Sequence, residues 1–193
     1  MEAGADAVGL IFAPESNRRI SLAEARALVR ALPAYVTPVA VFVDPRPDEV
    51  AAIEALGAMA QFSGDESPER VASLTGRRHI KALHFDQGAS YGPEDAERLA
   101  AAYPDADIMF DSRVGAKHGG TGTTFAWDAV AGLARRRPLI VSGGLTPANV
   151  AACVRAVRPF AVDVRSGVET NGIKDPAKVR AFVRAVRETD AEA

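Results

Sequence analysis

Short apolar runs alternate with segments of helical periodicity along this chain of 193 residues, and this alternation constrains the fold more than any other feature. Turn residues bound each run, and most runs are apolar throughout, as in parallel strands buried on both faces. Parallel neighbours need a crossover of a dozen or more residues, which the helical segments supply. The predicted strands are Ala7–Phe12, Pro38–Val43, Ala58–Phe62, His79–His84, Asp107–Phe110, Pro138–Val141 and Phe160–Val164.

Helix start signals follow several of these runs. Ser21 with Glu24 three residues later forms a capping-box pattern, and Pro47, Ser67-Pro68 and Thr146-Pro147 are typical of first helical turns. No linker, repeat or biased tract interrupts the series. The sequence therefore predicts one domain spanning residues 1–193.

Seven successive strand–helix units favour a closed parallel barrel over an open doubly wound sheet, because no Gly-rich dinucleotide loop follows the first strand. A barrel of this kind closes with eight units. Residues Met1–Gly4 resemble the last turn of a helix that Gly4 terminates. We therefore expect a (β/α)8 TIM barrel whose first strand and most of whose first helix are absent from this chain. The second and eighth strands of that barrel should have unpaired edges, and the chain should be poorly stable.

Charge and composition exclude several classes of function. The chain carries 23 Lys and Arg against 25 Asp and Glu, which gives a net charge of -2 and no broad basic face for nucleic acid. One cysteine and three scattered histidines give neither a disulfide nor a metal-ligand spacing. No apolar stretch approaches the roughly 18 to 20 residues that span a bilayer, and no secretory signal opens the chain. We expect a cytoplasmic protein without membrane or nucleic-acid partners, and no feature indicates an oligomeric state.

One polar residue ends an apolar run where a barrel has its active site. Asp111 follows Ile108-Met109-Phe110, so its carboxyl lies at the rim of a predicted apolar pocket. Burial raises a carboxyl pKa and keeps the group protonated at neutral pH, which suits a general acid. A loop or helix-capping aspartate explains the same pattern, and the sequence leaves both interpretations open.

Two Gly-containing segments follow the last two strands. Ser142-Gly143-Gly144 and Ser166-Gly167 place small residues where backbone N–H groups are exposed, and barrels often bind phosphate in these two loops. Either motif alone could be a tight strand-to-helix turn. Because both occur at these positions, we predict a phosphate site formed by Gly143, Gly144, Ser166 and Gly167.

Three further segments have weaker signals. Arg18 and Arg19 could hold a carboxylate at the barrel mouth, but exposed arginines are common in this chain. The Gly- and Thr-rich segment 117–124 is either a flexible active-site loop or a long connection. Cys153 lies in an apolar helical stretch without a histidine nearby in the sequence, so we interpret it as a core residue and not as a nucleophile.

Several of these motifs occur together in the order found in one family. The chain resembles the phosphoribosylanthranilate isomerases nearly from end to end. The resemblance rests on Gly4-Ala5-Asp6-Ala7-Val8-Gly9 with the loop Ser16–Ile20, on Phe110-Asp111-Ser112, on Gly119-Gly120-Thr121-Gly122 with Phe125 and Trp127, on Ser142-Gly143-Gly144-Leu145, on Asp163-Val164 with Ser166-Gly167-Val168-Glu169, and on Gly172-Ile173-Lys174-Asp175.

The resemblance implies a (β/α)8 barrel that rearranges N-(5-phosphoribosyl)anthranilate in tryptophan biosynthesis by an Amadori reaction without a cofactor. In the family pattern Asp111 is the general acid that opens the ribose ring, and a general base then removes the proton from C2. Arg18 would bind the anthranilate part of this phosphosugar substrate, and Asp163 would line the pocket. The phosphate would lie on the backbone of Gly143, Gly144, Ser166 and Gly167.

The chain departs from the family pattern at three places. The family's general base is a cysteine at the end of the first strand, a position that precedes Met1, and Cys153 does not match it. Ser63 stands where the family has histidine, and Arg165 stands beside the predicted phosphate site, where its charge could attract the phosphate or its bulk could block it. Two alternatives therefore stay open: a non-catalytic barrel that binds a phosphorylated ligand or a partner, and another phosphosugar enzyme of the same architecture.

Overall fold

A computed structural model describes residues 3–86, 90–113 and 127–191 of the chain. These residues form two compact units. We call residues 5–82 with 103–107 the N-terminal unit, and residues 83–102 and 108–191 with the first few residues the C-terminal unit. Strand β4 (His79–Asp86) begins in the N-terminal unit and ends in the C-terminal unit.

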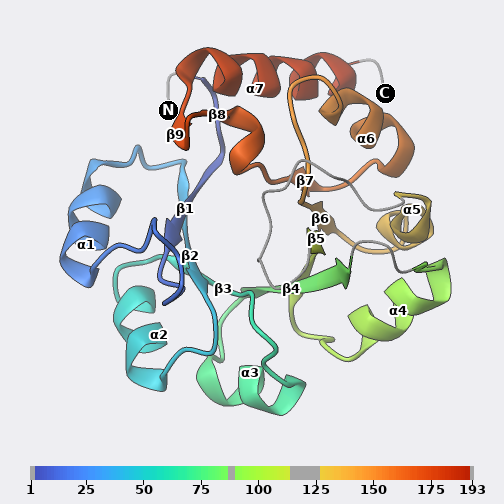
Figure 1. Ribbon diagram of the computed structural model, residues 1–193. Helices are drawn as coiled ribbons and strands as arrows, with labels where there is room; N and C mark the ends of the chain where they lie inside the picture. Colours follow the sequence, from blue (N-terminus) through green and yellow to red (C-terminus); the bar gives the residue numbers. More distant parts are fainter. Residues whose placement is uncertain (1–2, 87–89, 114–126, 192–193) are drawn as a thin grey trace. The chain divides into compact units, whose positions relative to one another are not determined.

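The N-terminal unit contains parallel strands in chain order. Strand β1 (Ala7–Ile11) pairs with β2 (Thr37–Phe42), β2 pairs with β3 (Met59–Phe62), and β3 pairs with the first part of β4. Figure 1 shows helices α1 (Leu22–Ala31), α2 (Pro47–Glu54) and α3 (Pro68–Leu74) along one side of these strands. Because the strands are parallel, the loops at their carboxyl ends all leave from the same edge.

The C-terminal unit continues the alternation. Strand β5 (Asp107–Arg113) pairs in parallel with β6 (Leu139–Val141), and β6 pairs with β7 (Ala161–Val162). The unit's helices are α4 (Pro93–Ala101), α5 (Asp128–Ala134), α6 (Val150–Val157) and α7 (Pro176–Asp190). After β7 the chain forms the short 3-10 helix η1 (Ser166–Val168) and a small antiparallel hairpin of β8 (Glu169–Thr170) and β9 (Ile173–Lys174).

The seven predicted strands are all present, and the boundaries differ from the prediction by a few residues. The predicted strand Pro138–Val141 begins one residue later in the structure, because Pro138, which has no N–H to donate to a neighbouring strand, lies outside β6. Among the described strands, β1 pairs only with β2 and β7 only with β6, so each has the unpaired edge that the sequence predicts. The start signal at Ser21 is also confirmed, because its side chain and Glu24 form both hydrogen bonds of a capping box.

The predicted helix start at Thr146-Pro147 is wrong, because α6 begins at Val150. The side chain of Asn149 forms a separate turn before the helix. Its Oδ1 accepts a hydrogen bond from the Thr146 N–H at 2.7 Å, and its Nδ2 donates to the Gly144 carbonyl at 3.0 Å. These two bonds occupy backbone groups of the segment 144–146, which therefore belongs to the loop after β6 and not to the helix.

The core of the N-terminal unit is apolar, and aromatic side chains at the ends of neighbouring strands lie next to one another. Phe12 lies 5.3 Å from Phe42, and Phe42 lies 6.5 Å from Phe62, measured between ring centroids. Val50 and Ile53 of α2 are fully buried against the same cluster. The residues that α2 contributes thus cover the face of the sheet that carries these rings.

A buried ion pair lies beside this apolar core. Lys81 Nζ is 2.6 Å from Glu66 Oε2, and both side chains are almost completely buried. Lys81 also donates to the Gly64 carbonyl at 2.7 Å, while Glu66 Oε1 accepts from the backbone N–H groups of Asp44 and Gly64. The pair therefore links β4 to the loops that follow β2 and β3, and it holds those loops in one arrangement.

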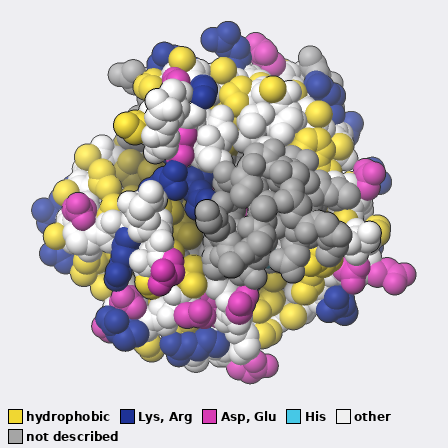
Figure 2. All heavy atoms as spheres, viewed as in Figure 1, with side chains coloured by type: hydrophobic (Ala, Val, Ile, Leu, Met, Phe, Trp, Pro, Cys, Tyr) yellow, Lys and Arg dark blue, Asp and Glu magenta, His cyan; other side chains and the backbone are white. Residues whose placement is uncertain are grey.

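The surface is of mixed charge where it can be seen. On the face shown in Figure 2, the described Lys and Arg side chains are interspersed with Asp and Glu side chains. Within the described ranges, no helix combines the length and the apolar character needed to cross a bilayer.

Removing one partner of the buried pair should be strongly destabilising, because the other charge is then buried without compensation. We expect Lys81→Met and Glu66→Gln each to lower the free energy of unfolding by about 3 to 5 kcal/mol, and the double variant to lose less than the sum of the two. Urea unfolding measures all three. Asp48→Asn, which removes the exposed partner of Arg46 at 3.1 Å, is the matched control and should change the stability far less. Additive losses at Lys81 and Glu66 would contradict the coupling.

Candidate active site

The Asp111 side chain lies near the carboxyl end of β5 in the C-terminal unit and is only 17% exposed. Its neighbour Phe110 is fully buried and packs 4.9 Å from Phe85 of β4. Asp111 Oδ1 is buried, and no described residue forms a hydrogen bond with it. The structure therefore places this carboxyl near the end of β5, largely buried and next to a buried aromatic side chain.

The surroundings of Asp111 favour its protonated form. Burial, and after it the negative charge of Asp163, raise the pKa of Asp111 from its usual 3.8 to about 7. The positive charge of Arg165 opposes these two effects. A carboxyl with a pKa of about 7 is substantially protonated at neutral pH and can donate a proton, as a general acid must.

Asp163 follows β7 and is held by its neighbour. Ser142, the first residue after β6, donates its hydroxyl hydrogen to Asp163 Oδ2 at 3.0 Å. Backbone hydrogen bonds fix both residues, because the Ser142 N–H donates to the Phe110 carbonyl and the Asp163 N–H donates to the Val141 carbonyl. Asp111, Ser142 and Asp163 thus come from the ends of three consecutive strands.

Gly143 touches the acid directly. A Cβ at this position would lie 2.3 Å from Ser112 N and 2.5 Å from Asp111 Oδ1, and the residue has a φ of +84°. Both the backbone conformation and the close approach require glycine here. Gly143 therefore shapes the space in which the Asp111 carboxyl lies, in addition to the phosphate contact that the sequence predicts.

The two predicted phosphate loops are in contact with each other. A Cβ at Gly167 would lie 1.8 Å from the Leu145 carbonyl oxygen, so the backbone of η1 packs directly on the loop after β6. Gly144 has a φ of +65°, and its carbonyl is held by Asn149. The loop that contains Gly143 and Gly144 and the segment that contains Ser166 and Gly167 therefore lie against each other.

The hairpin after η1 supports the second of these loops. Lys174 Nζ donates to the Arg165 carbonyl at 2.6 Å and lies 3.3 Å from Glu169 Oε1. Lys178 of α7 donates to the Glu169 carbonyl at 2.7 Å. The backbone at Arg165 is thereby fixed, while its guanidinium charge acts on Asp111.

His84 of β4 is a neighbour of Asp111 that the sequence analysis did not select. Its Nδ1 lies 3.8 Å from Asp111 Oδ2, and its side chain is 8% exposed. The residue ends the predicted strand His79–His84, so the rule that selected Asp111, a polar residue at the end of an apolar run, also applies to it.

Arg18 belongs to the N-terminal unit, in the loop from β1 to α1. Its backbone N–H donates to Ser16 Oγ at 3.2 Å, and the side chain is partly exposed. Ser63, the departure from the family motif, follows β3 in the same unit, and Gln61 Nε2 donates to its hydroxyl at 3.0 Å. The predicted contacts of Arg18 with a substrate stay predictions.

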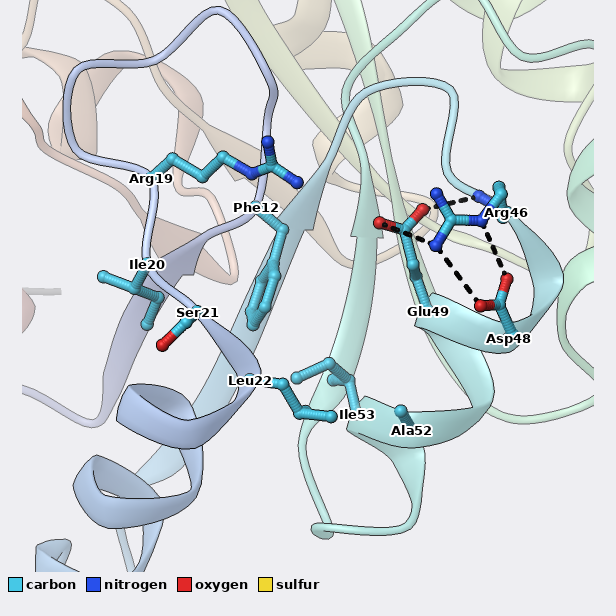
Figure 3. Close-up of a pocket in the computed structure, with 10 residues that line it drawn as sticks. All are labelled: Phe12, Arg19, Ile20, Ser21, Leu22, Arg46, Asp48, Glu49, Ala52 and Ile53. Atoms are coloured by element: carbon cyan, nitrogen blue, oxygen red, sulfur yellow. Dashed lines mark hydrogen bonds and ion pairs between the residues drawn. The ribbon is translucent and has the colours of Figure 1, made fainter.

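A groove of about 470 Å³ lies in the N-terminal unit between the start of α1 and α2. Figure 3 shows Phe12 and Ile53 on its apolar side and Arg46 at its rim, joined to Asp48 and Glu49. The bonds to Asp48 raise the pKa of Arg46 and lower that of Asp48, so both groups stay charged and paired. Neither group is suited to proton transfer near neutral pH, and we place the chemistry at Asp111.

Cys153 is confirmed as a core residue. The side chain is fully buried in α6, and burial raises the pKa of its thiol to about 12. It therefore stays a thiol near neutral pH. The predicted loop 117–124, including Gly119, Gly120 and Gly122, lies outside the described residues. In the part of the chain that is described, no three His, Cys, Asp or Glu side chains gather in a way that could hold a metal ion.

Comparison with known proteins gives a consistent result. The family model described as "N-(5'phosphoribosyl)anthranilate (PRA) isomerase" matches residues 1–185. N-(5'-phosphoribosyl)anthranilate isomerase of Desulforudis audaxviator is 44% identical over 191 residues, which cover 97% of this chain and 90% of the relative. The isomerase of Halorhodospira halophila is 45% identical over 194 residues, which cover 98% and 90%.

Solved structures agree with the sequence matches. Phosphoribosyl anthranilate isomerase from Thermotoga maritima has a TM-score of 0.84 and 36% identity, and the match covers 97% of this chain and 90% of that structure. A second structure of such an isomerase, in complex with reduced 1-(o-carboxyphenylamino)-1-deoxyribulose 5-phosphate, has a TM-score of 0.80 and 34% identity, with the same coverage. These structures are (β/α)8 barrels, which confirms the predicted fold class.

The raised pKa of Asp111 has a consequence for stability. Because the folded chain binds this proton more tightly than the unfolded chain does, the contribution is complete below the unfolded pKa of about 3.8 and is lost as the pH rises through about 7. Asp111→Asn keeps the shape without ionising. We expect this variant to be more stable than the unchanged protein by about 2 to 4 kcal/mol at pH 8, and about equally stable at pH 4. Urea unfolding at both pH values measures the difference, and equal stability at pH 8 would contradict the account.

Proposed function

The chain belongs to the N-(5'-phosphoribosyl)anthranilate isomerase family, and from this premise we propose how its residues perform the family's reaction. The protein is an isomerase of tryptophan biosynthesis. It converts N-(5'-phosphoribosyl)anthranilate to 1-(2-carboxyphenylamino)-1-deoxyribulose 5-phosphate by an Amadori rearrangement, in which an aldose derivative becomes a ketose derivative. The reaction needs one group that donates a proton and one that removes a proton.

Asp111 is the general acid of this proposal, and its buried position near the end of β5, which raises its pKa to about 7, is the observation that carries it. The carboxyl protonates the ring oxygen of the ribose, the bond from C1 to that oxygen breaks, and a Schiff base forms. A general base then removes the proton from C2 to give an enolamine, which becomes the ketone; in the family pattern this base is a cysteine, and none of the residues assigned here takes that role. Because burial raises the pKa of Asp111, its proton is available near neutral pH for opening of the ribose ring.

The phosphate of the substrate is assigned to the backbone of Gly143, Gly144, Ser166 and Gly167. The contact between Gly167 and Leu145 supports this assignment, because it brings the two loops against each other. Backbone N–H groups in such loops are suited to phosphate oxygens. Arg18 would bind the carboxylate of the anthranilate, and Asp163 would line the pocket beside Asp111.

Cys153 does not supply the general base. Its thiol is fully buried in α6, and a pKa of about 12 leaves almost no thiolate at neutral pH. The residue packs in the apolar face of the helix with Val150, Val154 and Val157, which are also buried. Its contribution is therefore to the core.

Asp111→Asn tests the acid. We expect the variant to lose at least 100-fold in kcat, because the amide cannot donate a proton of comparable acidity, while the KM changes little. Fluorescence of the anthranilate group follows the conversion. Cys153→Ala is the matched control, a buried residue of the same unit outside the proposed chemistry, and should keep kcat within about twofold. An Asp111→Asn variant as active as the unchanged protein would reject the proposed mechanism.

Gly167→Ala tests the phosphate assignment. The added methyl group would overlap the Leu145 carbonyl, so the two loops must separate. We expect KM for the substrate to rise at least tenfold, and inorganic phosphate to inhibit the variant more weakly than the unchanged protein. Gly132→Ala in α5, where a Cβ has nothing within 4 Å, is the control and should leave KM unchanged. Equal KM values for both variants would contradict the assignment.

A further inference from the structure

His84 lies beside the acid, and the mechanism above gives it no task. The residue is in the last part of β4, within the C-terminal unit, and its side chain is 8% exposed. Its Nδ1 faces Asp111 Oδ2 at 3.8 Å. A buried imidazole in this position can donate a hydrogen bond to a carboxylate, or carry a positive charge next to it.

We propose that His84 is a positioning residue that stabilises the carboxylate left on Asp111 after proton donation. The proposal rests on the proposed isomerisation. It adds to it the residue that stabilises ionised Asp111 once the ring is open. During ring opening the proton passes from Asp111 to the ribose oxygen, so a negative charge appears on a carboxyl that is largely removed from water. That charge needs a donor if the step is not to be strongly uphill.

The other described groups around Asp111 do not meet this need fully. Asp163 carries a negative charge and opposes ionisation of Asp111. The Ser112 N–H and the Ser142 hydroxyl favour ionisation less than Arg165 does, and the Ser142 hydroxyl also donates to Asp163. Arg165 provides a positive charge from the loop after β7 and favours ionisation. Asp111 Oδ1 is buried without a hydrogen-bond partner among the described residues, and Oδ2 is the oxygen that faces His84.

The distance fits a contact that closes during the reaction. An N–H···O hydrogen bond to a carboxylate is about 3 Å long, so His84 Nδ1 and Asp111 Oδ2 need to approach by about 0.8 Å. Catalytic hydrogen bonds are often long in a free enzyme and shorten when substrate is bound. A neutral carboxyl requires little from His84, whereas a carboxylate attracts its N–H, and the contact should therefore tighten when Asp111 ionises.

Titration of Asp111 tests the proposal without requiring turnover. The carboxyl carbon of Asp111, assigned by its absence in Asp111→Asn, is followed by 13C NMR between pH 4 and 10 in the unchanged protein and in His84→Phe. Because phenylalanine keeps the ring and removes the donor, we expect the titration midpoint to rise by about one unit. His84→Gln, whose amide can donate, should give a smaller rise. His79→Gln is the control, since His79 is buried in the same strand with its Nδ1 2.8 Å from the Arg77 carbonyl, and it should leave the midpoint unchanged.

Kinetics of the same variants give the second readout. We expect His84→Phe to lower kcat about tenfold, with KM within about twofold, and to move the alkaline limb of the pH profile upward together with the NMR midpoint. A folded His84→Phe variant with an unchanged midpoint and an unchanged kcat would overturn the proposal. If that variant does not fold, His84→Asn removes the imidazole in a smaller side chain and is judged by the same criteria. Absence of turnover in the unchanged protein would reject the proposed function, and the titration would still decide the role of His84.

Discussion

The parallel pairing of the strands is the constraint on which the site depends. In the C-terminal unit, β5, β6 and β7 run in the same direction, so the residues that follow them lie at one edge. Asp111, Ser142 and Asp163 are distant in sequence and are brought together by this rule alone. The backbone bonds from Ser142 to Phe110 and from Asp163 to Val141 continue the sheet into the site and fix the positions of both side chains.

The same arrangement makes Asp111 costly to ionise, and the proposed proton donation depends on this cost. A carboxyl that is 17% exposed and lies near Asp163 is costly to ionise, and the fold would be more stable without it. This cost keeps Asp111 substantially protonated at neutral pH, whereas the carboxyl of an aspartic acid exposed to water would be ionised. Gly143 preserves the space around the carboxyl, and the positive charge of Arg165 limits how far its pKa rises. Stability at this edge is therefore reduced in favour of a defined protonation state.

Prediction from the sequence succeeded where one physical rule decides the outcome. Buried parallel strands must be apolar, so the apolar runs of the sequence predicted the strands to within a few residues. The polar residue at the end of one run was Asp111. It failed at Thr146, where the side chain of Asn149 holds a turn and α6 begins only at Val150. The pair of Lys81 and Glu66 was not predicted, since a buried lysine in a strand carries no local signal and its partner is distant in sequence. The pKa of Asp111 also depends on Asp163 and Arg165, whose proximity only the fold creates.

The pH dependence of kcat/KM for the isomerisation tests the central claim most directly, because it reports the protonation state of the acid in the free enzyme. With N-(5'-phosphoribosyl)anthranilate as substrate, measured between pH 5 and pH 9, we predict a falling alkaline limb with a midpoint at about 7, the pKa of Asp111. A rate that is constant up to pH 9, or one that falls with a midpoint near 4, would show that a protonated Asp111 is not the group that opens the ring.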